Sequence, residues 1–299
     1  MGFEVHSTNF LKYALKNKTK THALQIGRQS IKLLPEKYLK EKFGILDHNE
    51  LGSFAEVLLT KYFDIKNVMS IDFSNYEDST FIADMNKPLS TSMAEKLNNK
   101  FDLAIDFGTL EHIYNVPQAL FNISYSCSSD ADIIHVLPAN GWIGHGFYQF
   151  TPELFFSVYS EENGYSNTEI FLANCDDSKY WYRVKKPENG IRSCAEGDGE
   201  AYILVKTTKI KNDFKHDNIQ QSDWIPKWNE SEEISQDIKS NLSFLNKIKN
   251  FIKEYELITQ IYRKIYFIFF KLFLLISRRE KISGMNPCLN KLNVNELLD

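Results

Sequence analysis

Short apolar runs alternate with longer amphipathic stretches along the first half of the chain. The runs that predict buried strands are 23–27 (ALQIG), 68–73 (VMSIDF), 80–84 (TFIAD), 101–106 (FDLAID) and 132–137 (DIIHVL). Stretches with helical periodicity lie around them, at 1–18, 31–42, 53–62 and 110–120. Strands that alternate with helices predict a mostly parallel sheet of right-handed βαβ units. The pattern therefore predicts an α/β protein with a Rossmann-like sheet.

The pattern changes after the fifth predicted strand. A loop with three glycines (residues 141–149, GWIGHGFYQ) leads into a helix start at Thr151-Pro152-Glu153, where Thr is an expected N-cap and Pro suits the first turn. Two further runs, 168–173 and 201–207, predict strands. We therefore place one domain over residues 1–210.

The last third of the chain has a different composition. Residues 211–245 are polar and predict a linker, and residues 286–299 predict a tail. Between them, 246–285 contain the apolar run IYFIFFKLFLLI, and 246–282 carry a net charge of +6. This run is too short to span a bilayer, which takes about 20 residues. A basic helix of this kind predicts peripheral contact with a membrane surface. A packing or dimerisation helix is the alternative.

Composition narrows the class of protein. The net charge of −4 argues against nucleic acid as the main partner. The four cysteines form no CxxC pair, and no His/Cys run has zinc-ligand spacing, so we expect reduced thiols and no metal. The N-terminal residues lack the apolar core of a signal peptide. These features predict a cytoplasmic protein.

Acidic residues end three of the predicted strands. Asp72, Asp84 and Asp106 follow apolar runs, and parallel strands present their carboxyl ends at one edge of the sheet. Gly27 follows the first strand and Gly108 the fourth, where a ligand could approach the backbone closely. Any one of these acids could simply cap a turn or helix. Together they favour a nucleoside site in the crevice, with an acid for a ribose diol.

The order of ALQIG, VMSIDF, TFIAD and FDLAIDFGTLEHI, followed by VPQALFNI, resembles the class I S-adenosylmethionine-dependent methyltransferases. The LEH-I-x-x-V-x-x-A-L pattern at 110–120 is the most specific part, and the resemblance covers about residues 20–210. It is closest to a bacterial subgroup with a GHGFYQF-type loop before a PELFF helix, often associated with surface-polysaccharide biosynthesis. The resemblance implies a seven-stranded sheet that ends in an antiparallel hairpin.

The resemblance also implies a function. It predicts S-adenosylmethionine as cofactor and methyl transfer, favouring O-methylation, to a small-molecule or glycan acceptor. The residues expected to bind the cofactor are Gly27, Arg28, Asp72, Asp84, Asp106, Phe107 and Gly108. The loop after the first strand has one glycine and no acid, whereas the family usually has three glycines and an acid. That departure motivates the alternative, a non-catalytic binding or scaffold protein of the same fold.

Histidines near the crevice are candidate bases for the acceptor hydroxyl. We expect His145 to be the first choice and His112 the second, although His112 could simply cap and pack. His135 lies within a strand and is expected to be a hydrogen-bonded core residue, and Glu111 a charge at a helix start. Trp142, Tyr148 and Gln149 are expected to contact the acceptor or to anchor the loop.

Overall fold

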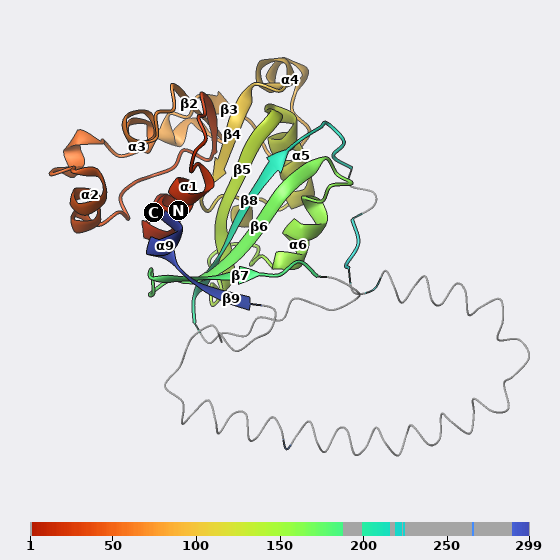
Figure 1. The fold of residues 1–299 in the computed structure, drawn as a ribbon. Coiled ribbons are helices and arrows are strands. Elements are labelled where there is room, and N and C mark those ends of the chain that lie inside the picture. Colours follow the sequence, from red (N-terminus) through yellow and green to blue (C-terminus); the bar gives the residue numbers. More distant parts are fainter. Residues whose placement is uncertain are drawn as a thin grey trace, which may run out of the picture.

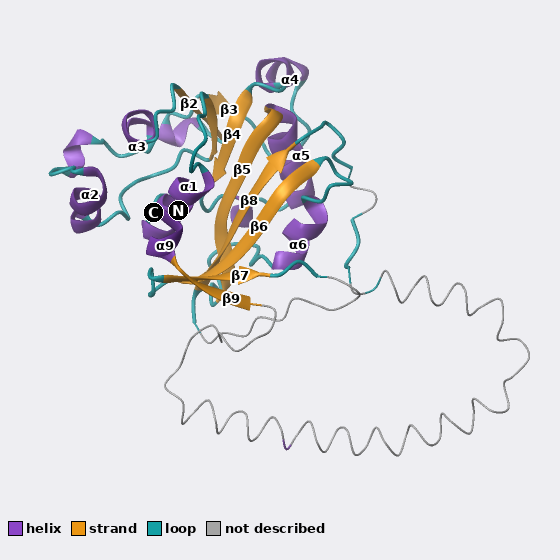
Figure 2. Cartoon of the chain, in the orientation of Figure 1, coloured by secondary structure: helices purple, strands orange, loops and turns teal. Residues whose placement is uncertain are grey.

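The centre of the protein is one twisted mixed sheet (Figures 1 and 2). The computed structural model describes residues 2–187, 199–215, 219–222, 224, 265 and 289–298. Their nine strands run in the order β3-β2-β1-β4-β5-β8-β6-β7-β9. The strands are β1 (His22–Ile26), β2 (Asn67–Asp72), β3 (Phe81–Ile82), β4 (Phe101–Asp106), β5 (Cys127–Asn140), β6 (Tyr165–Asn174), β7 (Tyr180–Val184), β8 (Ala201–Lys209) and β9 (Leu289–Asn293).

The sheet is half parallel and half antiparallel. β3, β2, β1, β4 and β5 pair in parallel, as expected for βαβ units. β8, β6, β7 and β9 continue the sheet with antiparallel pairs. The expectation of seven, mostly parallel strands is therefore wrong for the described residues. The predicted antiparallel strands at 168–173 and 201–207 are present, as β6 and β8.

Two strands account for the difference. β7 lies between the strands predicted at 168–173 and 201–207, where no strand was predicted, and it contains the buried Trp181. β9 comes from the segment assigned to the tail, and it pairs with β7 along its whole length, from Val184↔Leu289 to Tyr180↔Asn293. These two strands extend the sheet beyond the predicted hairpin.

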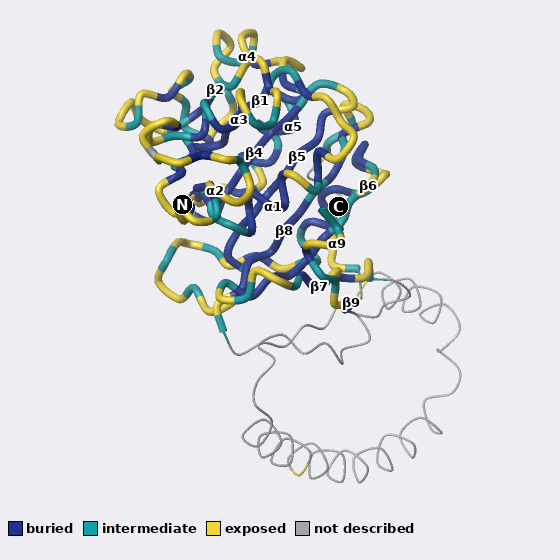
Figure 3. Tube along the Cα trace, turned by 60° about the vertical axis from the view of Figure 1, so that its left-hand side comes forward, coloured by how far each residue is buried: buried dark blue, intermediate teal, exposed yellow. Residues whose placement is uncertain are grey.

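Helices cover both faces of the sheet (Figure 1). One apolar core joins the sheet to α4 (Thr91–Leu97), α5 (Val116–Ser126) and α6 (Pro152–Val158). A second core joins the other face to α1 (Val5–Ala14), α2 (Glu36–Phe43), α3 (Glu56–Tyr62) and α9 (Val294–Leu298). The buried strands between exposed helix surfaces are seen in Figure 3. The chain is thus a three-layer α/β structure, in which α9 contacts α1.

The helix predicted after β4 is shorter than the apolar spacing suggested. A 3₁₀ turn, η3 (Leu110–His112), comes first, and Ile113 then adopts an extended conformation. α5 begins only at Val116, where the Asn115 side chain accepts a hydrogen bond from the backbone N–H of Gln118 and Pro117 occupies the first turn. The break leaves Glu111 and His112 in the short turn η3 above β4 and outside the α-helix α5.

No helix among the described residues is long and apolar enough to cross a membrane. The basic apolar stretch at 246–285 lies outside the described residues, apart from 265, and so does most of the predicted linker at 211–245, apart from 211–215, 219–222 and 224. Two cysteines, Cys194 and Cys288, also lie outside them. Membrane contact through 246–285 therefore stays a prediction. Cys127 and Cys175 are free thiols, as expected.

Candidate functional site

The carboxyl ends of β1 and β4 meet where the strand order of the sheet reverses. β1 pairs in parallel with β2 on one side and with β4 on the other. Ligands of open α/β sheets bind in the crevice outside such a switch point. Gly27 and Gly108 lie there with φ of 71° and 97°, values that glycine adopts readily. The Phe107 ring packs edge-on against Phe3 in the core, so only its backbone borders the crevice.

Beneath the crevice, Asp106 is the first member of a buried hydrogen-bonded chain. His135 donates from Nδ1 to Asp106 Oδ2 at 2.9 Å, and the Tyr159 hydroxyl lies 2.7 Å from His135 Nε2. Burial raises the pKa of Tyr159 well above its usual value, so this hydroxyl keeps its proton and donates it. His135 is fully buried, and both of its ring nitrogens have partners. The expectation that His135 is a hydrogen-bonded core residue is confirmed.

The second oxygen of Asp106 fixes the turn above β4. Asp106 Oδ1 accepts a hydrogen bond from the Thr109 backbone N–H at 2.9 Å, and the Thr109 hydroxyl donates to the Ile26 carbonyl at 2.6 Å. A Cβ on Gly27 would lie 2.5 Å from Thr109 Oγ1. Gly27 is therefore needed for this contact between the two loops as well as for its positive φ. Asp106, expected to bind the cofactor, positions the loops that form the crevice.

The Gly27 loop contains a buried acceptor that the sequence pattern did not indicate. The Gln29 side chain donates from Nε2 to the Ile26 carbonyl at 2.6 Å, and the Gln29 backbone N–H donates to Gln25 Oε1. Gln29 Oε1 is buried without a hydrogen-bond partner among the described residues. A buried acceptor without a donor is unfavourable, so this oxygen is a candidate ligand contact.

Arg28 is engaged within the protein. Its guanidinium pairs with Glu56 at 2.8 Å, donates to the Glu77 carbonyl at 2.6 Å and lies 4.2 Å from the centre of the Phe54 ring. These contacts join the Gly27 loop to α3 and to the turn after β2. Arg28 would have to exchange one of them to bind a cofactor carboxylate.

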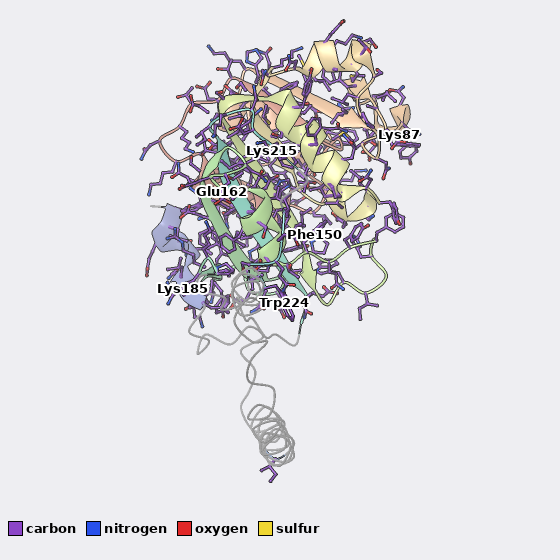
Figure 4. The ribbon with its side chains drawn as sticks, turned by 90° about the vertical axis from the view of Figure 1, so that its right-hand side faces the viewer. Lys87, Phe150, Glu162, Lys185, Lys215 and Trp224 are labelled. Carbon is purple, nitrogen blue, oxygen red and sulfur yellow. The ribbon has the colours of Figure 1, made fainter. Side chains whose placement is uncertain are left out.

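The two acids at the ends of β2 and β3 differ in their availability. Asp72 is partly exposed, and its Oδ1 accepts the backbone N–H of Phe73 at 2.6 Å. Asp84 accepts two hydrogen bonds from Asn86 and pairs with Lys87 at 3.0 Å (Lys87 is labelled in Figure 4), and the bonds from Asn86, then Lys87, lower the pKa of Asp84. Asp84 therefore closes a turn, whereas Asp72 keeps a partly exposed carboxylate at the end of β2.

Three groups above β4 form a cluster that no single sequence motif indicated. Glu111 is 0% exposed, and neither of its carboxylate oxygens has a hydrogen-bond partner among the described residues. Its Oε1 lies 3.6 Å from His112 Nε2 and 3.7 Å from His145 Nε2. The two imidazole rings, both candidate bases, are 5.2 Å apart. The structure thus brings His112 and His145 together, 33 residues apart in the chain.

Burial controls the charge of this cluster. Burial and the nearby Asp106 carboxylate raise the pKa of Glu111 to about 8. Burial, followed by the proximity of His145, lowers the pKa of His112. Glu111 was expected to be a solvated charge at a helix start, but it lies under the loop 141–149. His112 is mainly a neutral imidazole at pH 7, because even an unperturbed histidine is mostly neutral there.

The loop 141–149 is held over Glu111 by its own hydrogen bonds. Gln149 Oε1 accepts the Trp142 backbone N–H at 2.9 Å, and the Tyr148 hydroxyl donates to the Tyr114 carbonyl at 2.7 Å. The Trp142 ring lies 5.1 Å from that of His145. The loop ends at Phe150, labelled in Figure 4, whose N–H donates to the Pro138 carbonyl. These bonds anchor the loop, one of the two roles expected for Tyr148 and Gln149.

Large apolar side chains are exposed on two segments next to the strand ends, which the sequence pattern did not identify. Ile143 is 93% exposed and Phe147 67%, and the Phe147 ring lies 6.0 Å from that of Tyr114. On the β2 side, Phe73 and Tyr76 are also exposed. Exposed apolar groups that gather at one place commonly mark a binding surface. Exposed apolar residues therefore lie both on the loop 141–149 and on the turn after β2.

Comparisons with known proteins identify no family for this chain. No family model and no curated protein matches it. Among solved structures, it is similar to the N-methyltransferase NodS of Bradyrhizobium japonicum bound to S-adenosyl-L-homocysteine, with 9% identity over 69% of this chain and 86% of that chain and a TM-score of 0.38.

Two further solved structures give similar values. A Burkholderia thailandensis 1,6-didemethyltoxoflavin N1-methyltransferase matches with 11% identity over 69% of this chain and 78% of that chain, at a TM-score of 0.37. A SAM-dependent methyltransferase of Archaeoglobus fulgidus matches with 13% identity over 68% and 95%, at a TM-score of 0.38. Similarity at this level carries no argument about function. The function is therefore argued from the chain's own residues.

Proposed function

We propose that the chain is an S-adenosylmethionine-dependent methyltransferase that methylates a hydroxyl group of a small-molecule or glycan acceptor. The observation that carries the proposal is the crevice at the β1/β4 switch point. Asp72 ends β2 there with a partly exposed carboxylate, Gln29 Oε1 in the loop after β1 lacks a hydrogen-bond partner among the described residues, and the Glu111–His112–His145 cluster lies above β4. A methyltransferase needs one group of residues that binds the nucleoside cofactor and another that binds the acceptor, and these residues are the candidates for the two roles.

The residues present fit the cofactor. Asp72 would accept the hydrogen bonds of the ribose diol, and the exposed ring of Phe73 next to it is available to the adenine. Gln29 Oε1 would accept a hydrogen bond from the amino group of the methionine end, which supplies the donor that the buried oxygen lacks. Gly108 would allow close approach of the sulfonium at β4. When bound, the cofactor supplies an electrophilic methyl group.

The remaining residues align the acceptor and remove its proton. In methyl transfer the protein contributes mainly the alignment of the nucleophile and removal of a proton from a hydroxyl acceptor. A neutral imidazole can take that proton, and we assign this role to His145 or His112, whose side chains are 32% and 45% exposed. Trp142 and the exposed Phe147 would form the wall of the acceptor site.

Calorimetry with S-adenosylmethionine and S-adenosylhomocysteine tests the proposal. We expect the full-length chain to bind both, and Asp72→Ala to bind at least tenfold more weakly because the ribose diol loses its acceptor. Glu95→Ala, which removes an exposed acid on α4, is the matched control and should bind as the unmodified protein does. Absence of binding to the folded chain at millimolar ligand would overturn the proposal.

A second candidate is a binding or scaffold protein that has this fold without the cofactor. Two observations favour it: Arg28 is paired with Glu56, and Thr109 fills the space beside Gly27. Both contacts would have to loosen if the methionine end were to bind there. Under this alternative, S-adenosylhomocysteine would not bind and Asp72→Ala would leave cellular function unchanged.

A further inference from the structure

The Glu111 carboxylate is buried in a way that calls for a partner. The residue is 0% exposed and neither oxygen accepts a hydrogen bond from any described residue. Another polar atom beside it, His145 Nε2, is also buried without a hydrogen-bond partner in the described part of the chain. Burying such groups unpaired is costly, and proteins usually satisfy them with hydrogen bonds or with a metal ion.

The three side chains converge on one point. Glu111 Oε1, His112 Nε2 and His145 Nε2 offer one ligand atom each, and these atoms all lie within 4.8 Å of one another. The Glu111–histidine separations of 3.6 and 3.7 Å are too long for hydrogen bonds. They are close to the separation of about 3.4 Å between ligands of a tetrahedral ion with bonds of about 2.1 Å. Small side-chain rotations would therefore suffice for an ion.

We propose that Glu111, His112 and His145 bind a divalent transition-metal ion of the zinc class. Two imidazole nitrogens and one carboxylate oxygen suit Zn²⁺ or a similar ion, whereas Mg²⁺ and Ca²⁺ prefer oxygen ligands. A bound ion would place a positive charge beside the buried Glu111 side chain and so favour its ionised form. The cluster differs from a cysteine-rich zinc motif, so ligand spacing in the sequence gave no indication of it.

The surrounding backbone holds the ligands in place. The Phe147 N–H donates to the Glu111 carbonyl at 2.7 Å, and the His145 N–H donates to the Trp142 carbonyl at 3.1 Å. A Cβ on Gly146 would lie 2.7 Å from the Glu111 carbonyl oxygen, so glycine allows the loop to approach η3 this closely. Groups that orient the ligands in this way are a regular part of metal sites.

The site would be open on one side. Glu111 is covered, but the side chains of His112 and His145 are 45% and 32% exposed. Three protein ligands leave a tetrahedral ion with one position for a water molecule or a substrate oxygen. Resting on the proposed function, the acceptor hydroxyl would occupy this position. The positive charge of the ion would then lower the pKa of the hydroxyl, and water at the open side of the site would accept the proton. A histidine nitrogen that holds the ion cannot also take the proton, so the ion would replace His145 or His112 in that role.

Titration of the EDTA-treated, untagged full-length chain with ZnCl₂ tests the inference. We expect one Zn²⁺ per chain by calorimetry and a higher melting temperature with the ion bound. MgCl₂ should bind far more weakly. His145→Ala and Glu111→Gln should each weaken Zn²⁺ binding at least tenfold. His22 lies at the far end of β1, where its imidazole contacts Asn67. His22→Ala is therefore the control and should bind Zn²⁺ as the unmodified chain does.

Because His112 is partly exposed, His112→Ala is a further variant if the others fail to fold, and it should also weaken Zn²⁺ binding at least tenfold. Equal Zn²⁺ binding by all variants, or none by the unmodified chain, would overturn the inference. Calorimetry of the EDTA-treated chain with S-adenosylhomocysteine separates the two proposals. Cofactor binding without zinc binding would leave the proposed function in place, and zinc binding without cofactor binding would leave the metal site in place.

Discussion

Asp132→Ala should lower the free energy of unfolding by about 3–5 kcal/mol, as expected when one partner of a buried ion pair is removed. Asp132 lies in β5, opposite Leu103 of β4, and its side chain is 4% exposed. It pairs with Lys20 at 2.8 Å and Lys18 at 2.7 Å, and it accepts a hydrogen bond from Thr208. Lys20 is itself 8% exposed, so the substitution would leave a buried ammonium without its counter-charge.

Chemical denaturation at pH 7 measures this effect, and an exposed ion pair provides the control. Asp213 pairs with Lys211 at 2.7 Å, but both side chains are about half exposed. Asp213→Ala should therefore change stability by less than about 1 kcal/mol. Equal losses for the two variants would show that burial does not determine the contribution of Asp132.

The same residue should make stability depend on pH. Burial opposes the charged form of Asp132, but the hydrogen bonds from Lys18 and Lys20 outweigh burial and lower its pKa below 3.8. A carboxylate with a lowered pKa stabilises the fold above the unfolded-state pKa and loses this contribution as the pH falls through the folded-state pKa. The advantage of the unmodified chain over Asp132→Asn should therefore diminish below about pH 4.

The parallel half of the sheet could be predicted because its strands are buried on both faces. The run 101–106, buried on both faces, is apolar at four of its six positions, and the helices between such runs have a clear helical period. β9 has only one fully buried residue, Leu289, so its sequence resembles a polar tail. Its pairing with β7 depends on residues about 110 positions away in the chain, which no local pattern reveals.

Only some residues of the candidate site could be predicted from the sequence. Gly27, Asp72 and Gly108 could be predicted because strand ends determine where they lie. The cluster of Glu111, His112 and His145 could not, because it forms only when the loop 141–149 folds over η3. Pro117, in the first turn of α5, indicates in the sequence that a helix starts there, but the apolar spacing before it favoured one continuous helix from Leu110.

Asp106→Ala should lower the free energy of unfolding by about 3 kcal/mol or more. The substitution would leave the Thr109 N–H and His135 Nδ1 without acceptors, each at a cost of about 1–3 kcal/mol, and it would open a cavity. Asp106→Asn has the same size but only one acceptor oxygen, so we expect it to lose about half as much. Chemical denaturation curves of the unmodified chain, Asp106→Asn and Asp106→Ala measure the order of their stabilities.

Asp106 and Asp72 both end parallel strands and look equivalent in the sequence, yet the structure gives them opposite surroundings. Asp106 is 1% exposed with both oxygens engaged in the protein, whereas Asp72 is partly exposed. We therefore expect Asp106→Ala to destabilise the fold, and Asp72→Ala to leave stability nearly unchanged while it weakens S-adenosylhomocysteine binding. Melting temperature and calorimetry on the two variants separate these effects. A large loss of stability in Asp72→Ala would contradict the distinction, because an exposed carboxylate has little to contribute to the core.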